Sequence, residues 1–240
     1  MHPMIGHFFG RLTRVLPNIT AVQNTHIDAS FFVPSFNHHV GADLARLRSG
    51  RREPHLYDWI NRFPADAVFF DVGTNYGQEV VWAATQKGKN IRVVGFDCSM
   101  VAAHICGLNK ALNNDRFDFV FAAIGAQSGG LVEITANSDT HIPRLHKKNV
   151  PYRYHVPTLS LGDYAADHGV VPTHLKIDVD GAEPGVIAGA APLLANPILR
   201  EIFIEIDAEN ADLVHEIERY GFQISWHQTK QRDAEYLFVR

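Results

Sequence analysis

Short apolar runs alternate with amphipathic stretches along most of the chain beyond residue 60. The apolar runs have the length of buried strands, and the stretches between them repeat apolar residues at helical spacing. Strands separated by helices of this length indicate βαβ units and a mostly parallel sheet. The strands that this pattern predicts are 67–72, 92–97, 117–123, 175–179, 201–207, 222–226 and 236–239. We therefore expect an α/β fold with a doubly wound, Rossmann-like sheet of seven strands.

The remaining elements complete this expectation. The last two predicted strands are close enough in sequence to form a hairpin, which would add an antiparallel edge to the sheet. Residues 131–135 read as half of another hairpin, and 156–161 as an extended piece between the third and fourth strands. The helices that the spacing of apolar residues predicts are 56–63, 78–86, 100–112, 161–168, 184–194 and 211–220.

The first 60 residues follow a different pattern. Residues 4–16 place apolar side chains at helical spacing and predict a short amphipathic helix. We expect it to dock on its own domain or on a second subunit, because one short apolar stripe binds membranes only weakly. Residues 18–52 lack firm periodicity and read as irregular cover. The sequence thus predicts an N-terminal extension over 1–60, used as substrate cover or oligomer contact, and one domain over 61–240.

Composition narrows the class of protein. A chain of 240 residues with 46% hydrophobic residues is long enough for one well-buried core. Its formal net charge of -4 gives no basic field, so we expect no nucleic-acid partner. No apolar run is long enough for a membrane span, and Cys98 and Cys106 have neither disulfide nor zinc spacing. We expect a soluble, cytoplasmic protein, with a homodimer as one possible assembly.

The turn after the first predicted strand carries the first chemical motif. Gly73 and Gly77 follow Asp71, but the middle glycine of a dinucleotide-binding turn is missing. That glycine lets the backbone approach a pyrophosphate, so this site has no evident need to hold one. Asp97 ends the next strand, where a carboxylate accepts hydrogen bonds from ribose hydroxyls. Ribose without pyrophosphate points to S-adenosylmethionine, although either aspartate alone reads equally well as a cap or turn residue.

A second motif lies at the ends of two later strands. Lys176, Asp178 and Asp180 alternate with apolar residues, so their side chains share one face of a strand. Glu205 and Asp207 share a face of the following strand in the same way. If the two strands are neighbours in register, Lys176 lies beside Glu205. We therefore predict a buried Lys176–Glu205 ion pair with the two aspartates, Asp178 and Asp207, at its mouth.

Such a cluster has two interpretations, because several unpaired buried charges would be costly. It can be a self-neutralising network that fixes loop geometry, or it can supply a base that takes the proton of an attacking alcohol. Asp178 and His155 are the candidate bases, with Lys176 beside them. A divalent cation held by Asp178 and Asp207 is an alternative, which the charge of Lys176 disfavours. Glu183 is either a helix-capping residue or a hydrogen-bond partner of the substrate.

Together these segments resemble the FkbM-type S-adenosylmethionine-dependent methyltransferases. The similar segments are 71–77, 95–97, 158–163 and the most particular one, 176–183, and the resemblance runs from about residue 66 to 226. It implies a class I methyltransferase domain that methylates a hydroxyl of a sugar, a glycan or a glycosylated natural product. Asp97 stands where the family frequently has glutamate, and Cys98 where it frequently has proline.

We assign candidate roles on this combined basis. The predicted cofactor-binding residues are Asp71, Gly73, Asn75, Gly77, Asp97, Cys98 and Ala123. The predicted catalytic residues are Asp178, His155 and Lys176, and the predicted substrate-binding residues are Asp180, Glu183, Glu205 and Asp207. Two other functions stay open at this point: a nicotinamide-dependent oxidoreductase, and a non-catalytic scaffold that keeps the cofactor fold.

Overall fold

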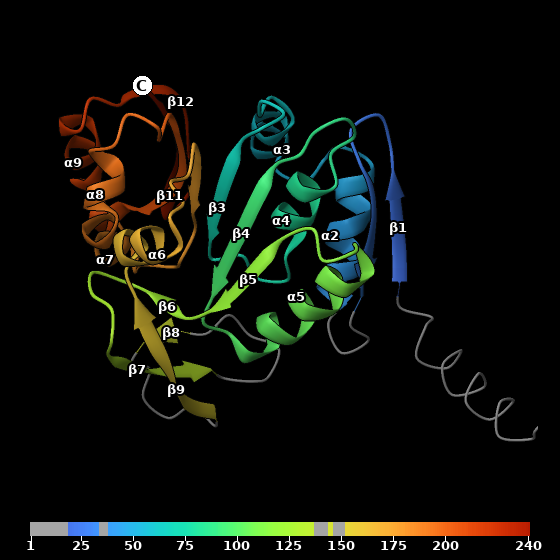
Figure 1. Ribbon diagram of the computed structural model, residues 1–240, viewed down its shortest axis with the longest axis horizontal. Coiled ribbons are helices and arrows are strands. Elements are labelled where there is room, and N and C mark those ends of the chain that lie inside the picture. The colour runs from blue at the N-terminus through green and yellow to red at the C-terminus, as the bar shows by residue number, and fades with distance from the viewer. Residues whose placement is uncertain (1–18, 34–37, 137–143, 146–151) are drawn as a thin grey trace, which may run out of the picture.

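The computed structural model describes residues 19–33, 38–136, 144–145 and 152–240 (Figure 1). Its centre is a seven-stranded sheet in the order β12-β13-β11-β10-β3-β4-β5. Strands β11, β10, β3, β4 and β5 are parallel, and β13 runs antiparallel to both of its neighbours. The bounds are β3 (Val68–Val72), β4 (Arg92–Asp97), β5 (Asp118–Phe121), β10 (His174–Ile177), β11 (Glu201–Asp207), β12 (Gln223–Thr229) and β13 (Asp233–Val239). The predicted doubly wound fold and its closing hairpin are confirmed.

Helices cover both faces of this sheet, which explains why its central strands are apolar on both sides. In β3, for example, Phe69 packs in one core cluster and Phe70 in the other. The first cluster lies under α2 (His38–Arg48), α3 (Pro54–Asn61), α4 (Gln78–Ala84) and α5 (Met100–Leu112). The second lies under α6 (Leu161–His168), α7 (Glu183–Gly189), α8 (Ala191–Leu194) and α9 (Leu213–Arg219). The helix predicted over 184–194 is therefore two helices that meet at Ala190, just before Pro192.

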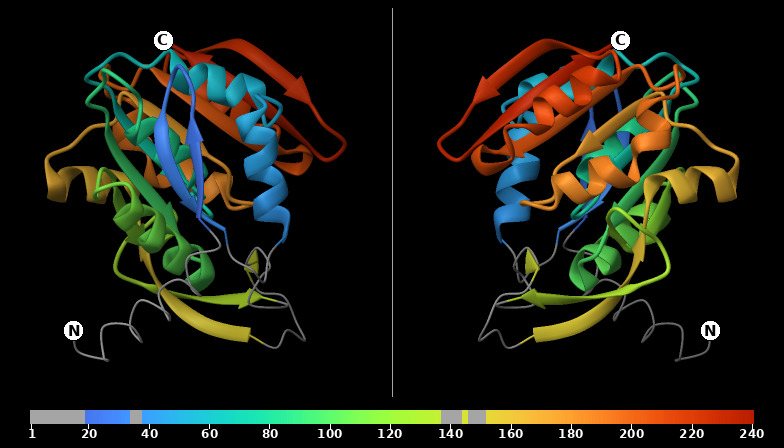
Figure 2. Two further views of the ribbon diagram at one scale, coloured as in Figure 1. Left: turned by 90° about the vertical axis from the view of Figure 1, so that its right-hand side faces the viewer. Right: turned by 90° about the vertical axis from the view of Figure 1, so that its left-hand side faces the viewer.

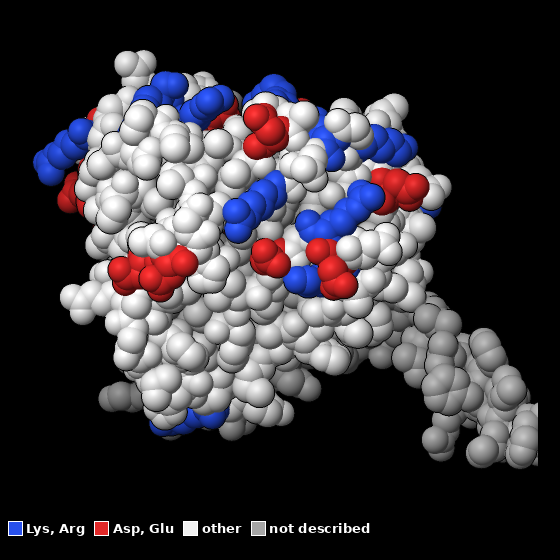
Figure 3. All heavy atoms as spheres, in the orientation of Figure 1, with Lys and Arg blue, Asp and Glu red and all other residues white. Residues whose placement is uncertain are grey.

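A second, four-stranded sheet in the order β6-β9-β7-β8 projects below the first in Figure 1. Its strands are β6 (Ala123–Ile124), β7 (Leu131–Ala136), β8 (Arg144–Leu145) and β9 (Tyr152–Leu159). The predicted hairpin strand at 131–135 is present as β7, which pairs antiparallel with β9. The strand predicted at 117–123 is divided, because Ala123 already belongs to this second sheet. On the face that Figure 3 shows, charges of both signs intermix over the main body.

The expectation of irregular structure over 18–52 is wrong. This segment contains the hairpin β1 (Ile19–Gln23) and β2 (Asp28–Phe32), followed by helix α2, and it packs along one side of the molecule (Figure 2). The alternation in β2 buries Ala29 and Phe31. The backbone of β2 is held by α5 and the residue after it, since Phe32 N–H donates to Asn109 at 2.7 Å and Ser30 N–H to Asn113 at 3.0 Å. In β1 only Val22 is buried, so this strand lacks the alternation by which a strand is recognised in sequence.

Helix α3 connects this N-terminal region to the main sheet. The Trp59 indole N–H donates to Glu201 Oε2 at 2.6 Å, and the Trp59 ring lies 5.4 Å from that of Phe203. Residues before position 60 therefore share a core with the sheet, and the division of the chain at 60 stays a prediction. The helix predicted at 4–16 lies outside the described residues. Among the residues described, no helix combines the length and apolar character needed to cross a bilayer.

Candidate active site

The register of the strands places four carboxylates in one line across the carboxyl edge of the main sheet. Glu205 pairs with Glu235, and Ile177 pairs with both Ile204 and Val72, so the next residue, Asp178, lies between Glu205 and Gly73. One strand further, the pairing of Val72 with Phe96 puts Gly73 beside Asp97. We call Glu235, Glu205, Asp178 and Asp97 the carboxylate row. Asp97 is two strands from Asp178, or about 10 Å.

Glycine allows the loop after β3 to close against this row. Gly73 has φ of 84°, and a Cβ placed on it would lie 1.7 Å from the backbone oxygen of Asp178. Gly77 has φ of 80°, and its Cβ would lie 2.7 Å from the sulfur of Cys106. A side chain at position 73 would therefore require the backbone to shift, and one at position 77 would require Cys106 to move and a left-handed conformation that side chains rarely adopt. Asn75 between them also has a positive φ, of 50°. The loop thus places the predicted cofactor residues beside Asp178, although they are a hundred positions apart.

Asp97 is held in place by backbone N–H groups from two elements. Asn75 donates to its Oδ2 and Ser99, the N-cap of α5, to its Oδ1, both at 2.7 Å. The side chain is half-buried, and burial raises the pKa of Asp97 although these hydrogen bonds lower it. A carboxylate offers about four lone-pair positions. The positions left over can accept the two hydroxyls of a ribose, so the residues present fit an adenosyl group.

Two neighbours complete this end of the row. Burial, with a smaller contribution from Asp97, raises the pKa of the Cys98 thiol to about 12, so this thiol is neutral. The Tyr154 hydroxyl, from β9 of the second sheet, donates to the backbone oxygen of Cys98 at 3.3 Å. It also accepts the N–H of Met100 at 3.4 Å. The second sheet therefore reaches the predicted ribose site through Tyr154, whereas Ala123 is half-buried in β6.

We expect Asp97→Ala to weaken binding of S-adenosylmethionine by roughly 10- to 100-fold, because hydrogen bonds to a charged group each contribute about 1.5–3 kcal/mol. Isothermal titration calorimetry with the cofactor alone measures this without a substrate. Asp118→Ala, on the exposed side of β5, is the control and should bind as the wild type does. An unaltered dissociation constant for Asp97→Ala would remove the ribose role from this residue.

The predicted ion pair between Lys176 and Glu205 is wrong. Lys176 Nζ lies 3.2 Å from Asp71 Oδ1 and 3.5 Å from Asp178 Oδ2. The reason is the register, which pairs Lys176 with Phe203, two residues before Glu205. Glu205 instead accepts a hydrogen bond from Lys230 at 2.5 Å. Alternation along the strand gave the correct face for all of these side chains but not their partners.

Lys176 contacts two carboxylates, of which one is buried and one is exposed. Asp71 is fully buried and Lys176 nearly so, whereas 44% of the Asp178 side chain is exposed. Burial raises the pKa of Asp71 although Lys176 lowers it. Burial lowers the pKa of Lys176, but four nearby carboxylates, led by Asp71 and Asp178, together raise it by more, so the ammonium stays charged. Lys176 therefore holds the Asp178 carboxylate in place from below, and Asp178 is the member that a substrate can reach.

Glu205 belongs to a second cluster around Lys230. Besides Glu205, Lys230 Nζ lies 2.9 Å from Glu235 and 3.8 Å from Asp233. Burial raises the pKa of Glu205 to about 7, with a further increase from Asp178 and an opposing effect of the Lys230 hydrogen bond. This carboxyl group therefore titrates near neutral pH. Asp207 ends β11, two residues after Glu205. Its Oδ2 would lie 3.3 Å from a Cβ added at Gly181, so it borders the loop after β10.

The loop after β10 contains the other predicted substrate residues. Asp180 is exposed and has φ of 52°. Glu183 is buried, and its Oε1 accepts the N–H of Gly181 at 2.8 Å. Its Oε2 accepts a hydrogen bond from Asn210 at 3.3 Å. Both carboxylate oxygens of Glu183 are therefore used to hold the loop at the start of α7. This local role is closer to helix capping than to substrate binding, which stays a prediction.

His155 is not brought to the row. It is exposed on β9, opposite Glu133, and successive residues of a strand point to opposite faces. Because Tyr154 points toward Cys98, His155 points away from it. Its catalytic assignment stays a prediction that the geometry does not favour. Within the described ranges, no group of three histidine, cysteine, aspartate or glutamate residues is placed to hold a metal ion.

A chain of polar side chains, which no sequence motif indicates, joins the N-terminal region to this site. The Tyr57 hydroxyl donates to Glu79 Oε1 at 2.7 Å, and Arg52 lies 3.6 Å from the same oxygen. Arg52 also pairs with Glu53 at 3.4 Å and with Asp43 at 3.0 Å. Glu79 is buried at the start of α4, directly after the glycine loop. These residues come from segments that looked irregular or purely helical in sequence.

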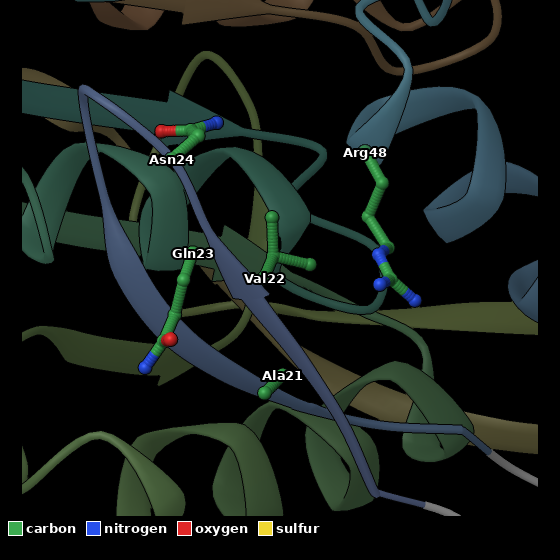
Figure 4. Close-up of a pocket in the computed structure, with 5 residues that line it drawn as sticks. All are labelled: Ala21, Val22, Gln23, Asn24 and Arg48. Carbon is green, nitrogen blue, oxygen red and sulfur yellow. The ribbon is translucent and has the colours of Figure 1, made fainter.

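A surface hollow of about 460 Å³ lies elsewhere, between β1 and the end of α2 (Figure 4). It is lined by residues 21–24 and by Arg48. None of the carboxylate row contributes to it. We therefore locate the functional site at the carboxyl edge of the main sheet, where ligands of open α/β sheets bind.

The doubly wound, mostly parallel sheet with a glycine loop after β3 is the fold of class I, Rossmann-like methyltransferases. The family model described as "Methyltransferase FkbM domain" matches residues 71–224. The chain belongs to this family, as its motifs suggested. It is an enzyme whose methyl donor is S-adenosylmethionine, and the alternatives of a nicotinamide oxidoreductase and a non-catalytic scaffold are set aside.

No curated protein matches the chain. Solved structures with a similar fold include the ribosomal protein L11 methylase of Lactobacillus delbrueckii subsp. bulgaricus (15% identity, 79% of each chain, TM-score 0.45). Another is the precorrin-6y C5,15-methyltransferase of Geobacter metallireducens (11% identity, 78% and 86% of the chains, TM-score 0.46). A third is fibrillarin of Aeropyrum pernix, solved with natively bound S-adenosyl-L-methionine (10% identity, 73% and 66%, TM-score 0.46).

Proposed function

We propose that this enzyme is an O-methyltransferase that acts on a hydroxyl of a sugar, a glycan or a glycosylated natural product. One observation carries the proposal: the exposed carboxylate of Asp178 lies in line with Asp97 and is held by a buried lysine. An alcohol is a weak nucleophile until it loses its proton, so its methylation needs a base near the reacting oxygen. Asp178 is placed to be that base.

The chain's own residues then have distinct tasks. S-adenosylmethionine, when bound, supplies an electrophilic methyl group. Asp97 holds the ribose, with Gly73 and Gly77 leaving room for the loop to approach. Asp178 would take the proton from the substrate hydroxyl as the oxygen–methyl bond forms and the sulfur–methyl bond of the donor breaks, which leaves S-adenosylhomocysteine, and Lys176 keeps the carboxylate oriented. Correct placement of the two reactants supplies much of the remaining acceleration.

The composition of the row supports a polyol as substrate. Carboxylates accept hydrogen bonds from hydroxyl groups, and Glu205 and Asp207 follow Asp178 along the edge of the sheet. Lys230 can donate to a ring or hydroxyl oxygen at the same place, because 39% of its side chain is exposed. A substrate with several neighbouring hydroxyls can use both kinds of contact.

A defined panel of alcohols tests the proposal. The enzyme is incubated with methyl-labelled S-adenosylmethionine and the methyl glycosides of glucose, galactose, mannose, rhamnose and glucosamine. Catechol and benzylamine serve as acceptors of other classes. We expect label in an O-methyl ether of one or more glycosides, located by NMR. Label only in catechol or in an amine would contradict the sugar assignment.

A further inference from the structure

Glu53, in the N-terminal region, has a backbone conformation that its sequence context disfavours. It has φ of 37° and ψ of 60°, a left-handed conformation that is unusual for a residue other than glycine. It also directly precedes Pro54, and the proline ring normally pushes the preceding residue toward extended conformations. Such outliers persist only where the surrounding structure determines them, and they concentrate at functional sites.

The usual explanation for an acidic residue at the start of a helix does not apply here. Glu53 is the N-cap of α3, but its side chain makes no capping hydrogen bond. It pairs instead with Arg52, which is itself fixed by Asp43 and Glu79. The carboxylate is thus held by Arg52, whose other contacts are to α2 and α4.

The ion pairs place this carboxylate near the active site, because Arg52 joins it to Glu79, which is buried at the start of α4 directly after the glycine loop. Burial and the charge of Glu79 raise the pKa of Glu53, Arg52 and Lys176 lower it, and Asp178 raises it again. The same Glu53 charge contributes to raising the pKa of Lys176. The charge of Glu53 therefore interacts with both Lys176 and Asp178. Its side chain is 37% exposed, so a ligand can reach it.

The packing of α3 gives the same location independently. Trp59, late in the helix, contacts Glu201 at the amino end of β11. The His55 ring, at the start of the helix, lies 4.4 Å from that of Trp226, which is level with Phe203 through the pairing of Leu237, so α3 begins nearer the carboxyl edge than it ends. Trp59 also packs on Phe203, which pairs with Lys176 and shares its face of the sheet. Asp178, two residues further, lies on that same face. Glu53 and Asp178 thus approach the same space from the helix layer and from the sheet.

We propose that Glu53 is a substrate-binding residue, which accepts a hydrogen bond from a second hydroxyl of the alcohol whose first hydroxyl Asp178 deprotonates. This inference rests on the proposed function and extends it to a residue outside the matched family region, which begins at 71. It also gives the left-handed backbone a reason, because that conformation directs the carboxylate to the substrate rather than to the helix end.

Three variants test the proposal. Glu53→Gln keeps the shape and removes the charge, and Glu53→Gly removes the side chain and relieves the positive φ. Asp58→Asn neutralises an exposed acid on the same helix and is the matched control. KM and kcat are measured with whichever compound of the panel is methylated, together with the cofactor dissociation constant and Tm.

Both Glu53 variants should raise KM for the alcohol by roughly tenfold or more, since each loses a charged hydrogen-bond acceptor. Cofactor affinity should not change, and Asp58→Asn should behave as the wild type. Glu53→Gly should have a Tm higher than that of Glu53→Gln by about 2–4 °C, because only glycine relieves the backbone.

The outcomes separate this proposal from the previous one. Methylation of catechol or benzylamine alone would reject the sugar as substrate. KM of the Glu53 variants for that compound would still show whether Glu53 binds the acceptor. Wild-type KM in Glu53→Gln would reject the binding role. Should the panel give no turnover, equal Tm values for the two variants would remove the strain on which the inference depends.

Discussion

Asp178→Asn is expected to lower methyl transfer by about 10²- to 10⁴-fold while leaving cofactor affinity nearly unchanged. The amide has almost the shape of the carboxylate, but it cannot take the proton of the attacking hydroxyl. Lys176 would keep its second and more buried partner, Asp71, so the loop should stay folded. Turnover is measured as S-adenosylhomocysteine formed with a methylated glycoside, and affinity by calorimetry.

Two comparisons make this result specific. Asp167→Asn neutralises an exposed aspartate of α6, on the other face of the sheet, and should have wild-type activity. Glu205→Gln should affect KM more than kcat if Glu205 binds substrate rather than accepting the proton. Full activity of Asp178→Asn would contradict the assignment of Asp178 as base and would direct attention to Glu205, whose pKa is raised to about 7.

Lys176→Met should lower the free energy of unfolding by about 3–5 kcal/mol, because it leaves the fully buried Asp71 without its partner. Asp71→Asn added to Lys176→Met should restore part of this loss, since the second change removes the uncompensated charge. Chemical denaturation at pH 7 measures all three proteins. The comparison tests a buried ion pair, which stabilises little in itself but is costly to break.

The matched control is Lys110→Met. Lys110 Nζ lies 3.3 Å from Asp118 Oδ1, nearly the length of the Lys176–Asp71 pair, but 60% of the aspartate is exposed. Its loss should cost about 0–1 kcal/mol. In Lys176→Met the pKa of Asp71 rises further above its unfolded value. The destabilisation should therefore be smaller at pH 5.5 and grow as pH rises toward 8. Equal losses for both lysines would mean that burial does not govern this pair.

The sequence was sufficient for the fold class and for the faces of the strands. Apolar runs of strand length, separated by helical spacing, permit few arrangements other than a doubly wound parallel sheet. Period-two alternation then places Lys176 and Asp178 on one face without reference to any other strand. The position of Asp97 at the end of the next strand follows from the same local pattern, as does the glycine loop beside it.

The alternation of apolar and polar residues did not predict the register between neighbouring strands. Alternation is satisfied equally well by a shift of two residues, and such a shift puts Phe203 rather than Glu205 beside Lys176 on β11. The observed partner, Asp71, lies on β3, the neighbouring strand on the other side. Register depends on the lengths of the connecting helices and on how they pack. The same limit applies to His155, whose direction is fixed by the pairing of β9 rather than by its neighbours in sequence.

The sequence by itself therefore determined the sheet, the cofactor motif and the list of acidic residues at its carboxyl edge, because each depends on a short local pattern. Only the tertiary structure decided which of those acids are paired, which are open, and that Arg52 and Glu53 join them. Those contacts link residues up to a hundred or more positions apart, and they arise from the register of neighbouring strands and from the packing of α3 on the sheet. Local periodicity contains no information about such packing.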